Sequence, residues 1–174
     1  MGDMIVNIAV QPGIKAYLWG FLLVAVLPVL VTVGVLLSVK MLPLGPIVGI
    51  ALTSLVLFGL IALLMTRNEI IFDDDTLRIR AGFYSHSVSR TAIDWQQSRI
   101  VDFKRQSDLK PGLRVNGIGL PGYQAGWFKL ANGSRAFVLL TQGQTVYLAL
   151  KQGEGLLLSV DRDFALLSEL SVQD

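Results

Sequence analysis

The residues that could do chemistry are few, and their spacing does not assemble a reactive site. His86 is the single histidine and lies between Ser85 and Ser87. A serine nucleophile needs a base to take its proton and a sharp turn to present it, yet no Gly-x-Ser-x-Gly turn occurs in the chain. We interpret His86 as an ordinary residue of an exposed strand, with Ser–His catalysis as the weaker alternative.

Three consecutive aspartates at 73–75 are the other group with chemical capacity. Carboxylates bind Ca²⁺, but the ligand spacing of an EF-hand loop is missing, so we interpret them as a turn between two strands. The absence of cysteine excludes disulfides and thiol catalysis. Gly117 and Gly119 are not followed by the helix that a dinucleotide-binding turn requires. We therefore predict no catalytic residues, no metal and no cofactor.

Charge is distributed unevenly along the 174 residues. Between Ala16 and Met65 the only charged residue is Lys40, whereas residues 66–174 hold 13 Lys/Arg and 12 Asp/Glu. The net charge of +2 comes without a clustered basic stripe, which argues against a nucleic-acid partner. The sequence predicts an N-terminal segment at 1–15, an apolar region at 16–65 and a soluble domain at 66–174.

The apolar region contains two uncharged runs, at 16–39 and 41–65. At ~1.5 Å per residue, a helix of either run is longer than the ~30 Å hydrocarbon core of a bilayer. Such lengths are untypical of core helices or of a cleaved signal peptide. We predict a transmembrane hairpin within the lipid bilayer, with the first helix kinked at Pro28.

A helical hairpin places both chain termini on one side of the membrane. Lys15 and Arg67 flank its outer ends and Lys40 its turn, so the positive-inside rule favours cytoplasmic termini at the cell (inner) membrane. Homo-oligomerisation through the helices is a further hypothesis, because two pairs have the small-xxx-small spacing that allows close contact. The pairs are Gly34/Ser38 and Gly45/Gly49.

After Arg67 the pattern changes to short strands separated by turn residues. Leu77, Ile79 and Ala81 alternate with arginines, which is the period of a half-buried strand. Nine strands are expected, at 69–72, 76–81, 85–89, 99–104, 113–116, 125–130, 135–141, 145–150 and 155–159. Asn132-Gly133 is a hairpin signal. The apolar segment 4–10 is either another strand or an interfacial segment.

The end of the chain changes period again. Phe164, Leu167 and Leu170 recur at three-residue steps behind Asp161, which predicts one amphipathic helix with an N-cap. Strands followed by a single helix favour a small barrel or orthogonal sandwich that the helix closes.

Residues 66–172 resemble the bacterial PH-like (pleckstrin-homology-like) domain family. The resemblance rests on the run from Asn116 to Tyr123, on Gly126-Trp127-Phe128, on the hairpin at 132–133 and on the ending 156–159 before an Asp-led helix. The two predicted transmembrane helices directly before the domain also resemble an arrangement found in this family. The resemblance implies a seven-stranded PH-type barrel capped by one C-terminal helix, with no catalytic signature.

Two groups of residues are candidates for contact with partners. Outward aromatics beside a cation are typical anchors, so Arg114, Tyr123 and Trp127 form the candidate protein surface, although core packing is the favoured interpretation of each aromatic. Lys104, Arg105 and Lys110 are candidates for contact with anionic lipid, although Asp102 and Asp108 dilute their charge. The loop matching the basic loop of phosphoinositide-binding PH domains holds the three aspartates, which would repel phosphate.

The sequence therefore predicts a non-enzymatic, membrane-tethered module that binds a protein or peptide at the membrane face. It would do so by accepting a strand at a sheet edge or by packing an apolar segment. Sensing of anionic lipid at the inner leaflet is the alternative, and a small membrane enzyme is the weakest hypothesis.

Overall fold

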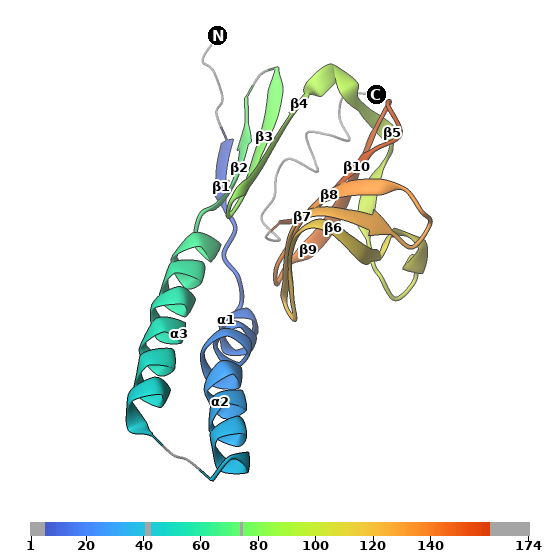
Figure 1. The fold of residues 1–174 in the computed structure, drawn as a ribbon. Helices are drawn as coiled ribbons and strands as arrows, with labels where there is room; N and C mark the ends of the chain where they lie inside the picture. The colour runs from blue at the N-terminus through green and yellow to red at the C-terminus, as the bar shows by residue number, and fades with distance from the viewer. Residues whose placement is uncertain (1–5, 41–42, 74, 161–174) are drawn as a thin grey trace.

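The computed structural model describes residues 6–40, 43–73 and 75–160. Two apolar helical segments extend from one end of a β domain (Figure 1). The first segment, Ile14–Ser38, consists of α1 (Ile14–Phe21), a π-helical turn at Leu22–Val26 and α2 (Leu27–Ser38); the second is α3 (Leu44–Met65). Both are long and apolar enough to cross a membrane, and few of their residues are buried in the protein itself.

Next to Pro28, where the sequence predicts a kink, the first helical segment contains the π-helical turn. Pro28 has no N–H to donate to the carbonyl of residue 24, and its ring crowds that turn of the helix. The wider turn at Leu22–Val26 lies immediately before it. Thr32 Oγ1 donates to the Pro28 carbonyl oxygen at 2.8 Å. The helix therefore continues past the proline with a changed local geometry.

The two helical segments pack through small residues and aromatic rings near the β domain. Phe21 and Phe58 meet edge to face with centroids 5.3 Å apart. The small-xxx-small glycines do not take part in this packing, because a Cβ placed on Gly34, Gly45 or Gly49 would meet nothing within 4 Å. Self-association through these glycines stays a prediction.

Ten strands form two sheets in the described residues. The four-stranded sheet has the order β1-β2-β3-β4 and the six-stranded sheet the order β5-β9-β10-β8-β7-β6. Their bounds are β1 (Val6–Ala9), β2 (Asn68–Phe72), β3 (Thr76–Ala81), β4 (Tyr84–Ser89), β5 (Ile93–Val101), β6 (Pro111–Leu120), β7 (Tyr123–Leu130), β8 (Arg135–Leu140), β9 (Gln144–Leu150) and β10 (Gly155–Val160).

Nine strands follow the helices, as the sequence periodicity predicts, and not the seven that the family resemblance implied. The six-stranded sheet includes a parallel pair. β8 and β9 are consecutive in the chain, but β10 lies between them, parallel to β8 and antiparallel to β9. The predicted C-terminal helix at 161–170 lies outside the described residues.

The N-terminal segment contributes a strand to the domain. β1 pairs antiparallel with β2, with Ala9 opposite Glu69 and Val6 opposite Phe72. The strand interpretation of this segment is therefore correct, and the four-stranded sheet is built from chain on both sides of the helical hairpin. The predicted domain boundary at residue 66 leaves β1 outside the domain to which it belongs.

Two hydrophobic clusters occupy opposite faces of the six-stranded sheet. Phe137, Leu139 and Leu156 belong to the cluster shared with the four-stranded sheet. Val138 and Leu157, their neighbours in sequence, belong to a second cluster on the other face. Successive strand residues point to opposite faces, so β8 and β10 read as continuous apolar runs because both of their faces are buried.

Candidate interaction surface

A shallow groove of about 540 Å³ lies at the end of β5. It combines apolar and basic side chains: Ile100 is 46% exposed, Phe103 is half-buried, and Lys104 and Lys110 are exposed. Its lining is Ile100, Val101, Asp102, Phe103, Lys104, Lys110, Gly143, Gln144 and Thr145. We call this set the β5 groove. Its size and mixed lining suit a short polypeptide segment or an amphipathic small molecule.

Asp102 fixes the shape of the loop that carries the lysines. Its Oδ1 accepts a hydrogen bond from the Lys104 N–H at 2.9 Å, as in an Asx turn. Its carbonyl oxygen accepts from the N–H groups of Arg105 at 2.9 Å and Gln106 at 2.8 Å. This explains why the predicted strand at 99–104 ends at Val101: the chain turns at Asp102.

The far end of the same loop is tied to the β7–β8 turn. The N–H of Asn132 donates to the Asp108 carbonyl at 2.9 Å, and that of Ala131 to the Lys110 carbonyl at 3.0 Å. Leu109 is buried in the second cluster. Lys104 and Lys110 are therefore presented from an ordered loop, and neither takes part in the ion pairs found among the described residues, Arg80–Glu69 and Arg135–Glu154.

The candidate basic residues are only partly gathered. Lys104 and Lys110 both line the β5 groove, while Arg105 is exposed beside it and is not among the lining residues. Arg114 is exposed on β6, between two shifts in the β6–β7 register. The structure thus brings two of the predicted cations together with apolar residues that sequence reasoning did not select.

Tyr123 is not a surface residue, which corrects its prediction as part of a protein-binding surface. It is 1% exposed, and its hydroxyl donates to Asn68 Oδ1 at 2.9 Å. Burial raises its pKa to about 12, although the hydrogen bond to Asn68 opposes that shift. An aromatic residue with a polar tip is often buried when the tip finds a hydrogen-bond partner. Here the partner is Asn68, which is too far from Tyr123 in the sequence to be identified from it.

Trp127 is half-buried and already packed by its own chain. Its ring lies edge-on to His86 at 4.9 Å and to Phe137 at 5.4 Å, and the Arg135 guanidinium lies 5.2 Å from its centroid. Because His86 is on β4 and Trp127 on β7, this contact joins the two sheets. Core packing therefore describes the role of Trp127 better than an exposed anchor for a protein partner does.

His86 packs against aromatic side chains of the β domain. It stacks on Phe137 at 5.4 Å with the rings 28° from parallel, and burial lowers its pKa while Glu154 opposes the shift. Within the described ranges, no group of three His, Cys, Asp or Glu side chains could hold a metal ion. At the aspartate turn the Asp73 N–H donates to the Thr76 carbonyl at 2.9 Å, as expected between β2 and β3.

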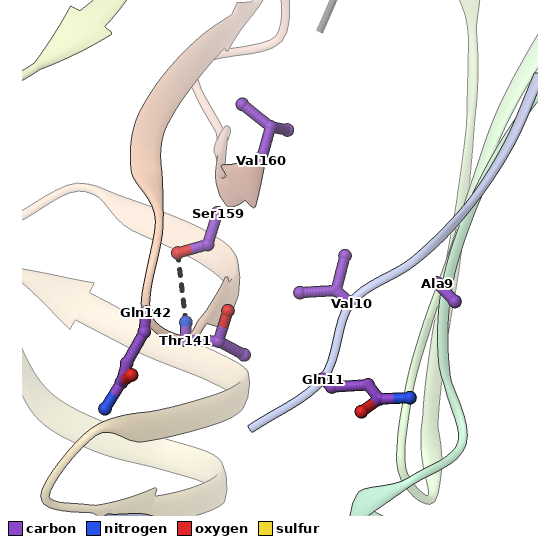
Figure 2. A pocket seen from close by; sticks show the side chains of 7 residues that line it. All are labelled: Ala9, Val10, Gln11, Thr141, Gln142, Ser159 and Val160. Carbon is purple, nitrogen blue, oxygen red and sulfur yellow. Dashed lines mark hydrogen bonds between the residues drawn. The ribbon is translucent and has the colours of Figure 1, made fainter. Parts of the chain in front are cut away.

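A second, smaller pocket of about 250 Å³ lies between the segment after β1 and the ends of β8 and β10. Figure 2 shows Val10 and Gln11 on one side and Ser159 and Val160 on the other, with the Thr141 N–H donating to Ser159 Oγ at 2.9 Å. Among the described residues, its lining holds no ionisable side chain. The described lining residues offer hydrogen bonds.

The fold defines a class: a β-sheet domain with a shallow surface groove, preceded by two apolar helices consistent with membrane anchoring. The family model for the bacterial PH domain matches residues 68–168. The chain belongs to the bacterial PH domain family. A search of curated proteins and a search of solved structures each found no match. The family match begins at β2, so it covers neither the helices nor β1.

Proposed function

We propose that this protein is a non-enzymatic, membrane-tethered interaction module whose β5 groove binds an acidic, partly apolar segment of a protein partner at the membrane face. The observation that carries the proposal is the pair Lys104 and Lys110 beside exposed Ile100 and half-buried Phe103. Apolar contact supplies binding energy and the lysines select acidic side chains.

Strand addition at β6 is the less favoured mode of peptide binding. β6 is an edge strand of ten residues, but it begins at Pro111, carries Arg114 and contains two register shifts before Asn116. Proline, charge and bulges are the features with which proteins prevent an edge strand from pairing. We therefore assign the partner to the β5 groove.

The test is crosslinking of the full chain in native membranes, followed by purification and identification of the captured proteins. The double variant K104E/K110E reverses both groove charges, and K129E/K151E makes the same charge change at exposed lysines outside the groove. We expect one reproducible partner with the native chain and with K129E/K151E, and its loss with K104E/K110E. Recovery of the chain alone, or equal recovery with both variants, would contradict the proposal.

Anionic lipid is a second candidate ligand because one side of the β5 groove, at Gly143, lies near the start of α1. Gly143 lines the groove, and a Cβ on Gly13, which precedes α1, would collide with the side chain of the adjacent Gln142. Lysines near the headgroups are attracted to anionic leaflets by about 1 kcal/mol each.

A probe in the groove would distinguish lipid from protein. Since the chain has no cysteine, a dye on Q144C reports on the groove of the full chain in vesicles. Lipid binding predicts a blue shift in phosphatidylglycerol vesicles that salt and K104E/K110E abolish. Identical emission in neutral and anionic vesicles would exclude lipid as the ligand of the groove. It would not affect the proposal of a protein partner.

A further inference from the structure

The β domain contacts its helices through the tips of two hairpins. At the β3–β4 tip, the Gly82 N–H donates to the Arg67 carbonyl at 3.2 Å, and a Cβ on Gly82 would lie 3.6 Å from the Leu64 carbonyl oxygen. The same Cβ position is 3.5 Å from the Tyr123 hydroxyl, at the β6–β7 tip. The two tips therefore lie together at the end of α3.

The β6–β7 tip reaches further along the helices. A Cβ on Gly122 would lie 3.7 Å from Lys15 Cβ, and a Cβ on Gly20 would lie 3.7 Å from Leu120 Cδ1 and 3.5 Å from Phe58. Gly20 is six residues inside the first helix, or about 9 Å at ~1.5 Å per residue. Leu120 is therefore held beside the apolar helices, below the level at which they begin.

This level lies close to the interface of a bilayer. α3 has 22 residues, so it is about 33 Å long and little longer than the ~30 Å hydrocarbon core. Tyr17 and Trp19 lie at the same level of the first helix, where amphipathic aromatics are enriched. Because such a helix extends only about 1–2 Å beyond the core at each end, a side chain about 9 Å inside the helix end lies below the boundary between headgroups and acyl chains.

Both tips also expose apolar residues near the helix ends. Phe83, next to Gly82, is 68% exposed, and Pro121 is exposed between Leu120 and Gly122. The helix surface beside them is apolar and exposed as well, with Leu18 and Leu63 each 56% exposed. Water-exposed phenylalanine at a hairpin tip is unfavourable, whereas burial of apolar surface contributes about 25 cal/mol per Å².

We propose that both hairpin tips insert into the membrane interface, with Phe83 and Pro121 in contact with lipid acyl chains. The occupant of this surface is lipid because the tips continue the apolar surface of helices that themselves cross the membrane. The domain is then held in one orientation by the two tips as well as by the helices. The proposal concerns the tips and does not depend on a ligand in the β5 groove.

The test uses single cysteines in the cysteine-free full chain, labelled with bimane and reconstituted into phosphatidylcholine vesicles. F83C and P121C place the probe at the tips. S87C lies four residues along β4 from Phe83, about 13 Å at ~3.3 Å per residue, and A131C lies beyond the opposite end of β7; both residues are exposed. Quenchers are nitroxide-labelled lipid, with the label near the headgroup, and aqueous iodide.

We expect the tip probes to be quenched by the nitroxide lipid and to show several-fold weaker iodide quenching than the S87C and A131C probes. Iodide quenching at F83C equal to that at S87C would overturn the proposal. So would protection of F83C that occurs in native membranes but not in pure lipid vesicles, because the occupant would then be a protein. Bimane is itself apolar and could draw a labelled site into the bilayer. Nitroxide quenching at S87C would show that this happens and would also count against the proposal.

Discussion

At the scale of single residues, Asn68 links the membrane anchor to the β domain. It is 1% exposed; its Nδ2 donates to the carbonyl of Met65, the last residue of α3, and its Oδ1 accepts from Tyr123. One amide thus satisfies a helix-end carbonyl that has no partner within the helix and a buried hydroxyl. Neither role is visible in sequence, because Asn68 and Tyr123 are 55 residues apart.

Removal of the Tyr123 hydroxyl should destabilise the domain. In Tyr123→Phe the buried Asn68 oxygen loses its donor, and an unsatisfied buried group costs about 1–3 kcal/mol. Urea unfolding of the detergent-solubilised chain, followed by tryptophan fluorescence, measures the change. Tyr84→Phe, at a half-buried tyrosine, serves as the control and should change stability by less than about 0.5 kcal/mol. Equal effects of the two variants would show that the Tyr123–Asn68 bond contributes nothing.

His86 should make stability depend on pH. Burial lowers its pKa in the folded state below the ordinary 6.5, against the opposing effect of Glu154. The unfolded state therefore binds more protons, so this contribution is complete above pH 6.5 and is lost as pH falls through the lower folded pKa. In a chain without a histidine tag, an NMR titration of this single histidine gives the pKa directly. Glu154→Gln should lower the pKa further; a pKa above 6.5 would contradict the assigned cause.

At the scale of elements, β6 and β7 approach unusually closely at a glycine pair. Gly126 has φ +110°, and a Cβ there would collide with the Asn116 carbonyl oxygen, while a Cβ on Gly117 would collide with the Ala125 carbonyl oxygen. Gly117 and Gly126 are register partners beside the second bulge of β6. The glycine-rich run thus permits backbone contact within a hairpin, next to a bulge of β6.

Gly126→Ala should cost more than its backbone strain alone. A non-glycine residue in this region of φ and ψ costs about 1–3 kcal/mol, and the collision with Asn116 adds to it. Gly153→Ala is the matched control, because Gly153 has φ +85° but open space around it. We expect a clearly lower urea midpoint for Gly126→Ala than for Gly153→Ala. Equal urea midpoints would mean that the close approach of β6 and β7 at Gly126 adds nothing to the loss of stability.

Individual elements were largely predictable from sequence, and their arrangement was not. β3 is an alternating run bounded by turn residues, and its predicted range 76–81 is the observed one, because period 2 and turn chemistry are local properties. The insertion of β10 between β8 and β9 depends on pairing between distant segments, for which no local signal exists. The β5 groove was missed for the same reason: Lys104 and Gln144 meet only after β5 and β9 have paired.

At the scale of the whole molecule, pairing of β1 with β2 fixes the topology of the hairpin. Antiparallel pairing requires both outer ends of the helices on one side of the membrane, and Lys15 and Arg67 there outnumber Lys40 at the turn. We predict that this side is cytoplasmic.

Cysteine labelling tests this topology. Q11C and S87C, at exposed positions beside and within the four-stranded sheet, should react with an impermeant maleimide in inside-out vesicles, and K40C should react in right-side-out vesicles. Reaction of Q11C and S87C on opposite sides would contradict the β1–β2 pairing. Reaction of both from outside would retain the pairing and reverse the predicted orientation.

The position of β1 also sets an order of events during synthesis. β1 leaves the ribosome first, but its partner β2 follows only after both helices, so β1 waits unpaired while the hairpin inserts. If the second helix failed to return across the membrane, β1 and β2 would stand on opposite sides and the four-stranded sheet could not be completed. We therefore expect that only a chain whose second helix returns across the membrane can complete the four-stranded sheet.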